Sequence, residues 1–177
     1  MYGLRSAVAV CAAAAFTTAC VPALDWREVR PPGSQLRAMF PCKPASHARR
    51  VTLARSTVEM SLYACSAGDV SYALAFADLA DPARVGPALE ELGRALAANV
   101  QAAAPAASAP LAVAGMTPND RAAAWRVEGR LPDGRAVQER AALFAYGTRI
   151  YQATVVAARL PDDEALGNFF GGLRVMP

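Results

Sequence analysis

The cysteines have the widest chemical range in this sequence, because a thiol can be acylated, oxidised to a disulfide, bind a metal or attack an electrophile. The chain contains Cys11, Cys20, Cys42 and Cys65. No pair is spaced as Cys-x-x-Cys, so thioredoxin-type redox exchange has no motif here. A zinc site needs more ligands than Cys42, Cys65 and the single histidine, His47. We therefore expect no metal site and no cofactor.

The other candidates for chemistry are His47 and two groups of carboxylates. His47 lies in the basic stretch 43–50, which we expect to be a solvated surface loop. Glu90-Glu91 and residues 162–164 fit the polar face or the first turn of a helix, where solvated charge is the simpler interpretation. The sequence lacks the motifs of serine hydrolases, P-loops, dinucleotide-binding folds, zinc proteases and calcium loops. These observations favour a protein that is not an enzyme.

The first nineteen residues have the three-part layout of a secretory signal, with Arg5, an apolar run over 6–16 and a small-residue exit. The apolar run is about 11 residues long, whereas a membrane-spanning helix needs roughly 20. No later stretch is long and apolar enough to span a membrane. We therefore expect an exported chain that is either soluble or held at a membrane by a covalent lipid.

Thr17-Thr18-Ala19-Cys20 resembles a lipobox, the motif at which bacterial lipoproteins are cleaved and then lipidated on the cysteine. Ala19 and Cys20 fit the pattern, whereas Thr17 stands where leucine is usual. The resemblance implies a lipid such as palmitate on Cys20. Val21, rather than an acidic residue, follows the cysteine, which in enterobacterial lipoproteins implies sorting to the outer membrane.

Two other interpretations of this region remain open. Val21-Pro22-Ala23 could be an ordinary signal-peptidase site, which would release a soluble periplasmic protein beginning at Leu24. Cys11 could carry the lipid, but Val10 before it is large and the signal would be short. Export places Cys42 and Cys65 in an oxidising space, so we expect a disulfide between them, with free thiols as the alternative.

Alternating apolar residues and turn signals predict an α+β domain with a mainly antiparallel sheet of about seven or eight strands. The expected boundaries are a signal peptide over 1–19, an anchor and lead-in over 20–35, and a single domain over 36–177. Strands are expected at 36–40, 50–54, 57–65, 70–77, 111–116, 122–130, 136–146 and 148–157. Residues 57–77 should form a hairpin, 102–110 a low-complexity loop, and 122–157 a three-stranded meander.

Two helices should cover this sheet. Asp81 and Pro82 are typical of a helix start, and Val85, Leu89, Leu92, Leu96 and Val100 follow in one apolar stripe. A second helix is expected from about Asp162, with an apolar stripe formed by Leu166, Phe169, Phe170 and Leu173.

This layout resembles the PsbP-like family and the related DcrB-like envelope lipoproteins. The resemblance rests on the first strand ending Phe40-Pro41-Cys42-Lys43-Pro44, the central helix, the hairpin-rich second half and the closing segment 169–173. It covers most of the mature chain, but no motif in it fixes a functional residue. It implies an assembly or accessory factor, and a disulfide would be this protein's own addition.

Charge is unevenly distributed along the chain, although the formal net charge is only +3. Asp25 and Glu28 are the only acidic residues of the segment 25–55. Its basic residues are Arg27, Arg30, Arg37, Lys43, Arg49, Arg50 and Arg55. Because this segment follows the proposed anchor, it could rest on anionic lipid head groups, and a scattered solvated set is the alternative. Nucleic acid is not an expected partner.

The function that these observations favour is a non-catalytic envelope lipoprotein. It would be held at the periplasmic face of the outer membrane through Cys20 and would bind or support another envelope component. A soluble periplasmic protein that binds a small ligand is the alternative. In that case Trp125, Phe144 and Tyr146 could line a pocket between sheet and helices. An enzyme using Cys42 or Cys65 would require a free thiol.

Overall fold

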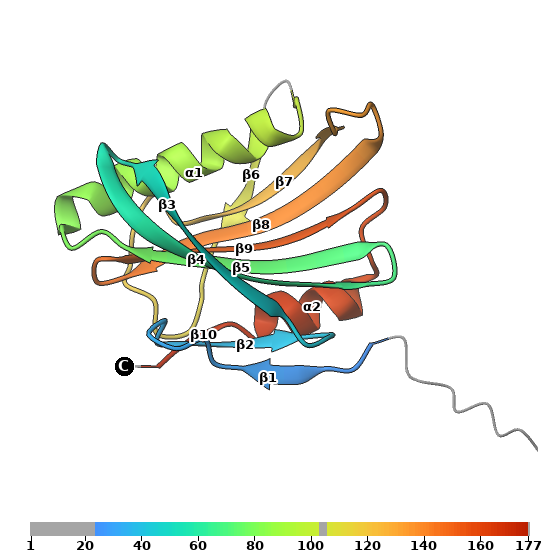
Figure 1. The fold of residues 1–177 in the computed structure, drawn as a ribbon, viewed down its shortest axis with the longest axis horizontal. Coiled ribbons are helices and arrows are strands. Elements are labelled where there is room, and N and C mark those ends of the chain that lie inside the picture. Colours follow the sequence, from blue (N-terminus) through green and yellow to red (C-terminus); the bar gives the residue numbers. More distant parts are fainter. Residues whose placement is uncertain (1–23, 103–105, 177) are drawn as a thin grey trace, which may run out of the picture.

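The computed structural model describes residues 24–102 and 106–176 and has three layers (Figure 1). The middle layer is a seven-stranded antiparallel sheet in the order β3-β4-β5-β9-β8-β7-β6. Its strands are β3 (Ala45–Leu53), β4 (Ser56–Ala67), β5 (Val70–Asp78), β6 (Ala106–Pro110), β7 (Ala123–Arg130), β8 (Ala136–Tyr146) and β9 (Arg149–Ala157). The expected α+β class is confirmed.

The helix α1 (Val85–Asn99) covers one face of the sheet and follows a short 3₁₀ turn, η1 (Pro82–Arg84). Asp81 caps that turn by accepting a hydrogen bond from the Ala83 N–H, and Pro82 occupies its first position, so the start signal was read correctly. The predicted apolar stripe is buried in one core with sheet residues such as Leu143 and Ile150. That burial explains why this segment is helical despite the two glycines and one proline within it.

The opposite face of the sheet is covered by α2 (Asp163–Gly171) and a small sheet of β1 (Arg27–Val29), β2 (Leu36–Phe40) and β10 (Arg174–Val175) (Figure 1). Asp162 caps α2 through the Ala165 N–H, as its position predicted. The core of this side is rich in aromatic rings, with Phe40 and Tyr72 both packed edge-on against Phe169. These rings belong to one buried apolar cluster that joins α2 and the small sheet to the large sheet.

Several strands follow the predictions closely. β2 and β8 have the expected bounds, β4 and β5 form the expected hairpin, and β7, β8 and β9 form the expected meander. Residues 70–76 alternate as expected, with Tyr72, Leu74 and Phe76 buried on the α2 side.

Other expectations were wrong. Residues 111–116 form no strand apart from an isolated bridge between Ala114 and Arg174, whereas 106–110, expected as loop, form β6. β3 begins at Ala45, so His47 lies in a strand and not in a loop, although its side chain is exposed. The lead-in expected over 20–35 contributes β1, which pairs with β2. Short or alanine-rich strands such as these take their structure from neighbouring strands more than from their own pattern.

The expected disulfide is present between Cys42 and Cys65, whose Cα atoms are 6.0 Å apart. Cys42 follows β2 of the small sheet, and Cys65 lies in β4 of the large sheet. The bond therefore joins two layers of the fold. Cys11, Cys20 and the signal segment lie outside the described residues.

Candidate functional site

The face of the sheet that carries α1 is only partly covered. α1 packs on β7, β8 and β9, and the tip of the hairpin formed by β3 and β4 curls toward it (Figure 1). Leu62 of β4 is 37% exposed, and in the described part of the chain only Met176 is a comparably exposed large hydrophobic residue. We call the surface between α1 and the β3–β4 hairpin, over residues 47–62 and 84–99, the seam.

The middle of the seam is a groove of about 250 Å³. Its lining combines apolar side chains from the strands and the helix with basic side chains on the outer strand: Met60, Leu62, Leu92, Ala95, His47 and Arg49. In the strand register, His47 lies opposite Leu62 and Arg49 lies opposite Met60. The groove therefore has an apolar floor with a basic rim along β3.

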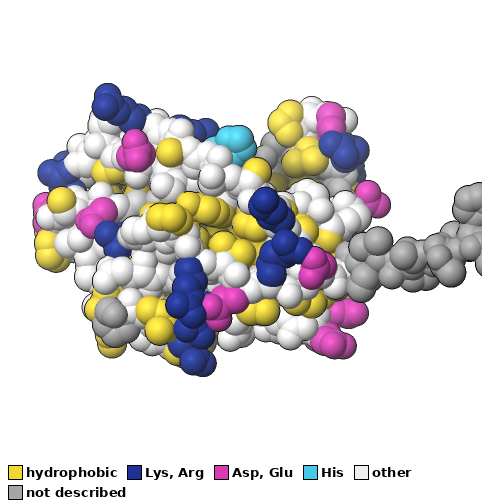
Figure 2. All heavy atoms as spheres, turned by 60° about the horizontal axis from the view of Figure 1, so that its bottom comes forward, with side chains coloured by type: hydrophobic (Ala, Val, Ile, Leu, Met, Phe, Trp, Pro, Cys, Tyr) yellow, Lys and Arg dark blue, Asp and Glu magenta, His cyan; other side chains and the backbone are white. Residues whose placement is uncertain are grey.

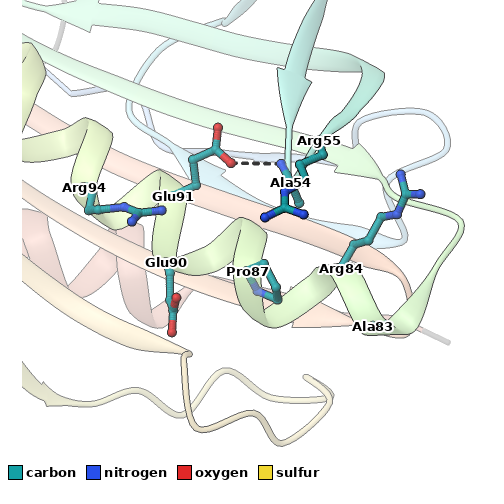
Figure 3. A pocket seen from close by; sticks show the side chains of 8 residues that line it. All are labelled: Ala54, Arg55, Ala83, Arg84, Pro87, Glu90, Glu91 and Arg94. Atoms are coloured by element: carbon teal, nitrogen blue, oxygen red, sulfur yellow. Dashed lines mark hydrogen bonds between the residues drawn. The ribbon is translucent and has the colours of Figure 1, made fainter.

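At the tip of the hairpin the seam widens into an open hollow of about 560 Å³ (Figure 3). The two turn residues, Ala54 and Arg55, have φ angles of 48° and 62°, a conformation that glycine or asparagine usually supplies. The Glu91 carboxylate of α1 accepts a hydrogen bond from the Ala54 N–H at 2.9 Å. This contact fixes the strained turn against the helix, and Figure 3 shows Arg55 directed back toward α1.

The seam carries positive charge that has no acidic partner. Arg49, Arg55 and Arg94 form no salt bridge within the described residues. Glu90 and Glu91 also line the hollow, where Glu91 accepts the hydrogen bond from the Ala54 N–H and Glu90 pairs with Arg121 at 2.7 Å. The two glutamates were expected to be merely solvated, and for Glu91 that expectation was wrong. An anionic group is the natural complement of this surface.

Trp125, Phe144 and Tyr146 do not line one common pocket, although Trp125 lines a hollow of about 500 Å³ between α1 and β7, beside Leu89 and Ala97. Trp125 faces α1 and packs on Gly93, where an added Cβ would lie 2.8 Å from the indole ring. Phe144 is fully buried on the other side of the sheet, stacked on Tyr151 at 4.9 Å. Consecutive side chains of a strand point to opposite faces, so β7 and β8 separate these residues.

The basic residues nearest the proposed anchor are largely paired with acidic neighbours. Arg27 pairs with Asp25, and both Arg30 and Arg37 pair with Glu28. Figure 2 shows the basic side chains of this side of the molecule in separate groups with acidic side chains beside them.

The rest of the expected basic patch lies on other elements. Lys43 follows the disulfide-bonded Cys42, whereas Arg49, Arg50 and Arg55 belong to β3 and its hairpin turn. The segment therefore does not form one continuous basic surface, and its two parts lie in different layers.

Sequence reasoning missed Glu139, a carboxylic acid buried on the α1 side of the sheet. In the register of β8 it lies between Val127 and Val156, and it is only 6% exposed. Burial raises its pKa to about 7 from an ordinary value of 4.5. Among the described residues it has no hydrogen-bond or ion-pair partner. Its position in a strand of otherwise apolar inward residues was the available signal.

Within the described ranges, no cluster of His, Cys, Asp and Glu side chains could hold a metal ion, and no helix is long and apolar enough to cross a bilayer. In comparisons with known proteins, no family model and no curated sequence matches the chain. The seam combines an exposed apolar side chain, Leu62, with basic side chains around a groove.

Proposed function

We propose that this protein is an exported, lipid-anchored domain that binds another component of the bacterial cell envelope through the seam. The observation that carries the proposal is the exposed apolar floor at Leu62 beside unpaired arginines. Apolar side chains are usually covered when a helix already packs on the same sheet, and an open groove with polar groups at its rim is typical of a binding site.

The anchor and the fold together suggest how the domain is presented. Few residues separate Cys20 from Trp26, and an extended chain spans at most about 3.5 Å per residue, so the domain would stay close to the membrane. The chain enters the fold through β1, in the layer opposite α1 (Figure 1). We infer that the β1–β2–β10 layer lies nearest the membrane and that the seam is open to a partner on the far side of the sheet.

This arrangement changes the role proposed for the basic residues. Arg27, Arg30 and Arg37 are paired, which leaves Lys43 as the main free charge near the anchor. These ion pairs leave little free positive charge beside the anchor, so we do not propose that this segment binds anionic head groups strongly. The unpaired arginines of the hairpin serve the seam instead.

The alternative function, a soluble protein with a small ligand in an internal pocket, is favoured less. Of the side chains expected to line that pocket, only Trp125 borders the open hollow beside α1, whereas Phe144 is fully buried on the other side of the sheet. The resemblance to PsbP-like and DcrB-like proteins remains a proposal that agrees with a non-catalytic binding role.

A photo-crosslinking amino acid tests the proposal. It would replace Leu62 in the seam or, as a matched control, the similarly exposed Met176 near β10 in the natively expressed protein. We expect a discrete adduct with an envelope component from position 62 and none of the same mass from position 176. Equal adducts from both positions, or none from position 62, would overturn the seam as the binding site.

A further inference from the structure

β3 is an edge strand whose outer side is open. It stands at the end of the strand order, and its side chains from Ala45 to Arg50 are exposed. Its register with β4 is regular from Leu53 to Ala45, without a bulge, and the strand contains no proline. Long, regular edges of this kind can pair with an additional strand.

The hairpin turn determines which backbone groups face outward. Leu53 and Ser56 flank a two-residue turn with both φ angles positive, so they form a hydrogen-bonded pair. Hydrogen-bonded and non-hydrogen-bonded pairs alternate along an antiparallel ladder. The N–H and C=O groups of β3 that point away from β4 therefore belong to Ser46, Ala48, Arg50 and Thr52.

The charge of the edge limits what can pair with it. β3 carries Arg49 and Arg50 and no acidic residue. A second copy of β3 would bring these cations together, and like charges on neighbouring strands are destabilising. Arg50 has Glu59 opposite it in the register, whereas Arg49 faces Met60 and the groove. The edge is thus complementary to a strand with acidic side chains and not to itself.

We propose that an extended acidic segment of the envelope partner adds to β3 as a further antiparallel strand, with alternate side chains directed into the seam. This inference rests on the proposed function. The backbone of the segment would bond to the outward groups of β3. Its acidic side chains on the seam face would meet Arg49, and the alternate side chains would point to the other face of the sheet.

The probe for this proposal is a fluorescent nine-residue peptide of alternating valine and glutamate, added to the detergent-solubilised full protein. A second peptide has alternate amides N-methylated, which removes strand pairing and keeps the charge. A third carries lysine in place of glutamate. We expect the first peptide to bind and both of the others to bind at least tenfold more weakly. Equal binding of the N-methylated peptide would overturn strand addition.

Protein variants locate the binding. Arg49→Glu should weaken binding of the acidic peptide at least tenfold, whereas Arg126→Glu, at an exposed and unpaired arginine of β7, should leave it unchanged. Ala48→Pro removes an outward N–H without touching the β3–β4 ladder and should weaken binding to a similar degree. Circular dichroism confirms that each variant is folded. Equal losses for Arg49→Glu and Arg126→Glu would overturn the site.

Amide hydrogen exchange tests the same proposal in the wild-type protein, where no substitution can disturb folding. In the wild-type protein, the acidic peptide should slow exchange at the amides of Ser46, Ala48, Arg50 and Thr52. Slower exchange only at other amides would contradict the proposal. If phosphatidylglycerol vesicles displace the peptide and these four amides show no slowing, the proposal also fails, and the surface binds lipid instead. If Ala48→Pro keeps the crosslink from position 62, strand addition fails and the seam function stands.

Discussion

At the scale of single residues, Glu139 gives the fold a pH dependence. Burial raises the pKa of Glu139 to about 7, so the folded state holds this proton more tightly than the unfolded chain, where the value is near 4.5. The stabilisation is complete below about pH 4.5 and is lost as the pH rises through 7. The carboxylate should then cost on the order of 2–3 kcal/mol at pH 8.

The variant Glu139→Gln should therefore be more stable than wild type at pH 8 and about equal to it at pH 4.5. Urea unfolding at the two pH values measures this difference. Glu128→Gln, at an exposed glutamate of the neighbouring β7, is the matched control and should change little at either pH. An equal effect of Glu139→Gln at both pH values would show that the carboxyl is not desolvated in the folded protein.

Gly129 is another residue whose identity is set by close packing. An added Cβ would overlap the carbonyl oxygen of Val100, which accepts a hydrogen bond from the Arg130 N–H at 2.6 Å. We expect Gly129→Ala to lower the free energy of unfolding by more than about 2 kcal/mol. Gly167→Ala in α2, where the added methyl meets nothing, should raise it by about 0.5–1 kcal/mol. Thermal unfolding compares the two, and equal losses would contradict the packing argument.

At the scale of elements, the connection between the hairpin turn and α1 depends on one carboxylate. Removing it in Glu91→Ala leaves the part-buried Ala54 N–H without its partner, so we expect a loss of about 1–2 kcal/mol and faster exchange of that amide. Glu90→Ala removes only a surface ion pair with Arg121 and should cost less than about 1 kcal/mol. Chemical denaturation compares the free energies of unfolding of the two variants, and hydrogen exchange follows the Ala54 amide. An unchanged exchange rate of that amide in Glu91→Ala would refute the contact.

The disulfide connects the small sheet to the large one, so we expect its removal to destabilise the small sheet more than the large one. In the double variant Cys42→Ser, Cys65→Ser, we expect a loss of about 3 kcal/mol, because the bond closes a loop with a sequence separation of 23. Hydrogen exchange should accelerate in β1 and β2 more than in β8 and β9. Uniform acceleration through all strands would show that the bond stabilises the molecule as a whole and not the attachment of this layer.

Which elements the sequence predicts depends on how each one obtains its stability. β5 and β8 and the stripe of α1 bury their own apolar side chains, so their periodicity is visible in the sequence. β6 consists of alanine, serine and proline and is held by pairing with β7, which no local pattern reveals. β1 and β10 are only 3 and 2 residues long.

The candidate site was predicted only in part for the same reason. The basic residues of β3 stood out in the sequence by their types and positions. Their assignment to the seam required knowing that the tip of the hairpin reaches α1, which depends on contacts between residues far apart in the chain, such as Ala54 and Glu91. The buried state of Glu139 likewise depends on the layer that covers β8.

At the scale of the whole molecule, the domain has three layers, and in the proposed function its first residues hold it near a membrane with the binding surface on the far layer. The proposed anchor would determine which surfaces a partner can reach, because the described chain enters the fold through β1. The same domain released at Leu24 would present every face. The processing of the N-terminus therefore distinguishes the two functions most sharply.

The most direct test is mass spectrometry of the N-terminal peptide of the natively expressed protein, purified through a C-terminal tag. The account predicts a chain that begins at Cys20 and carries acyl groups on that cysteine, and Cys20→Ser should abolish them. A chain that begins at Leu24 without lipid would contradict the anchored-domain account and favour a soluble periplasmic binding protein.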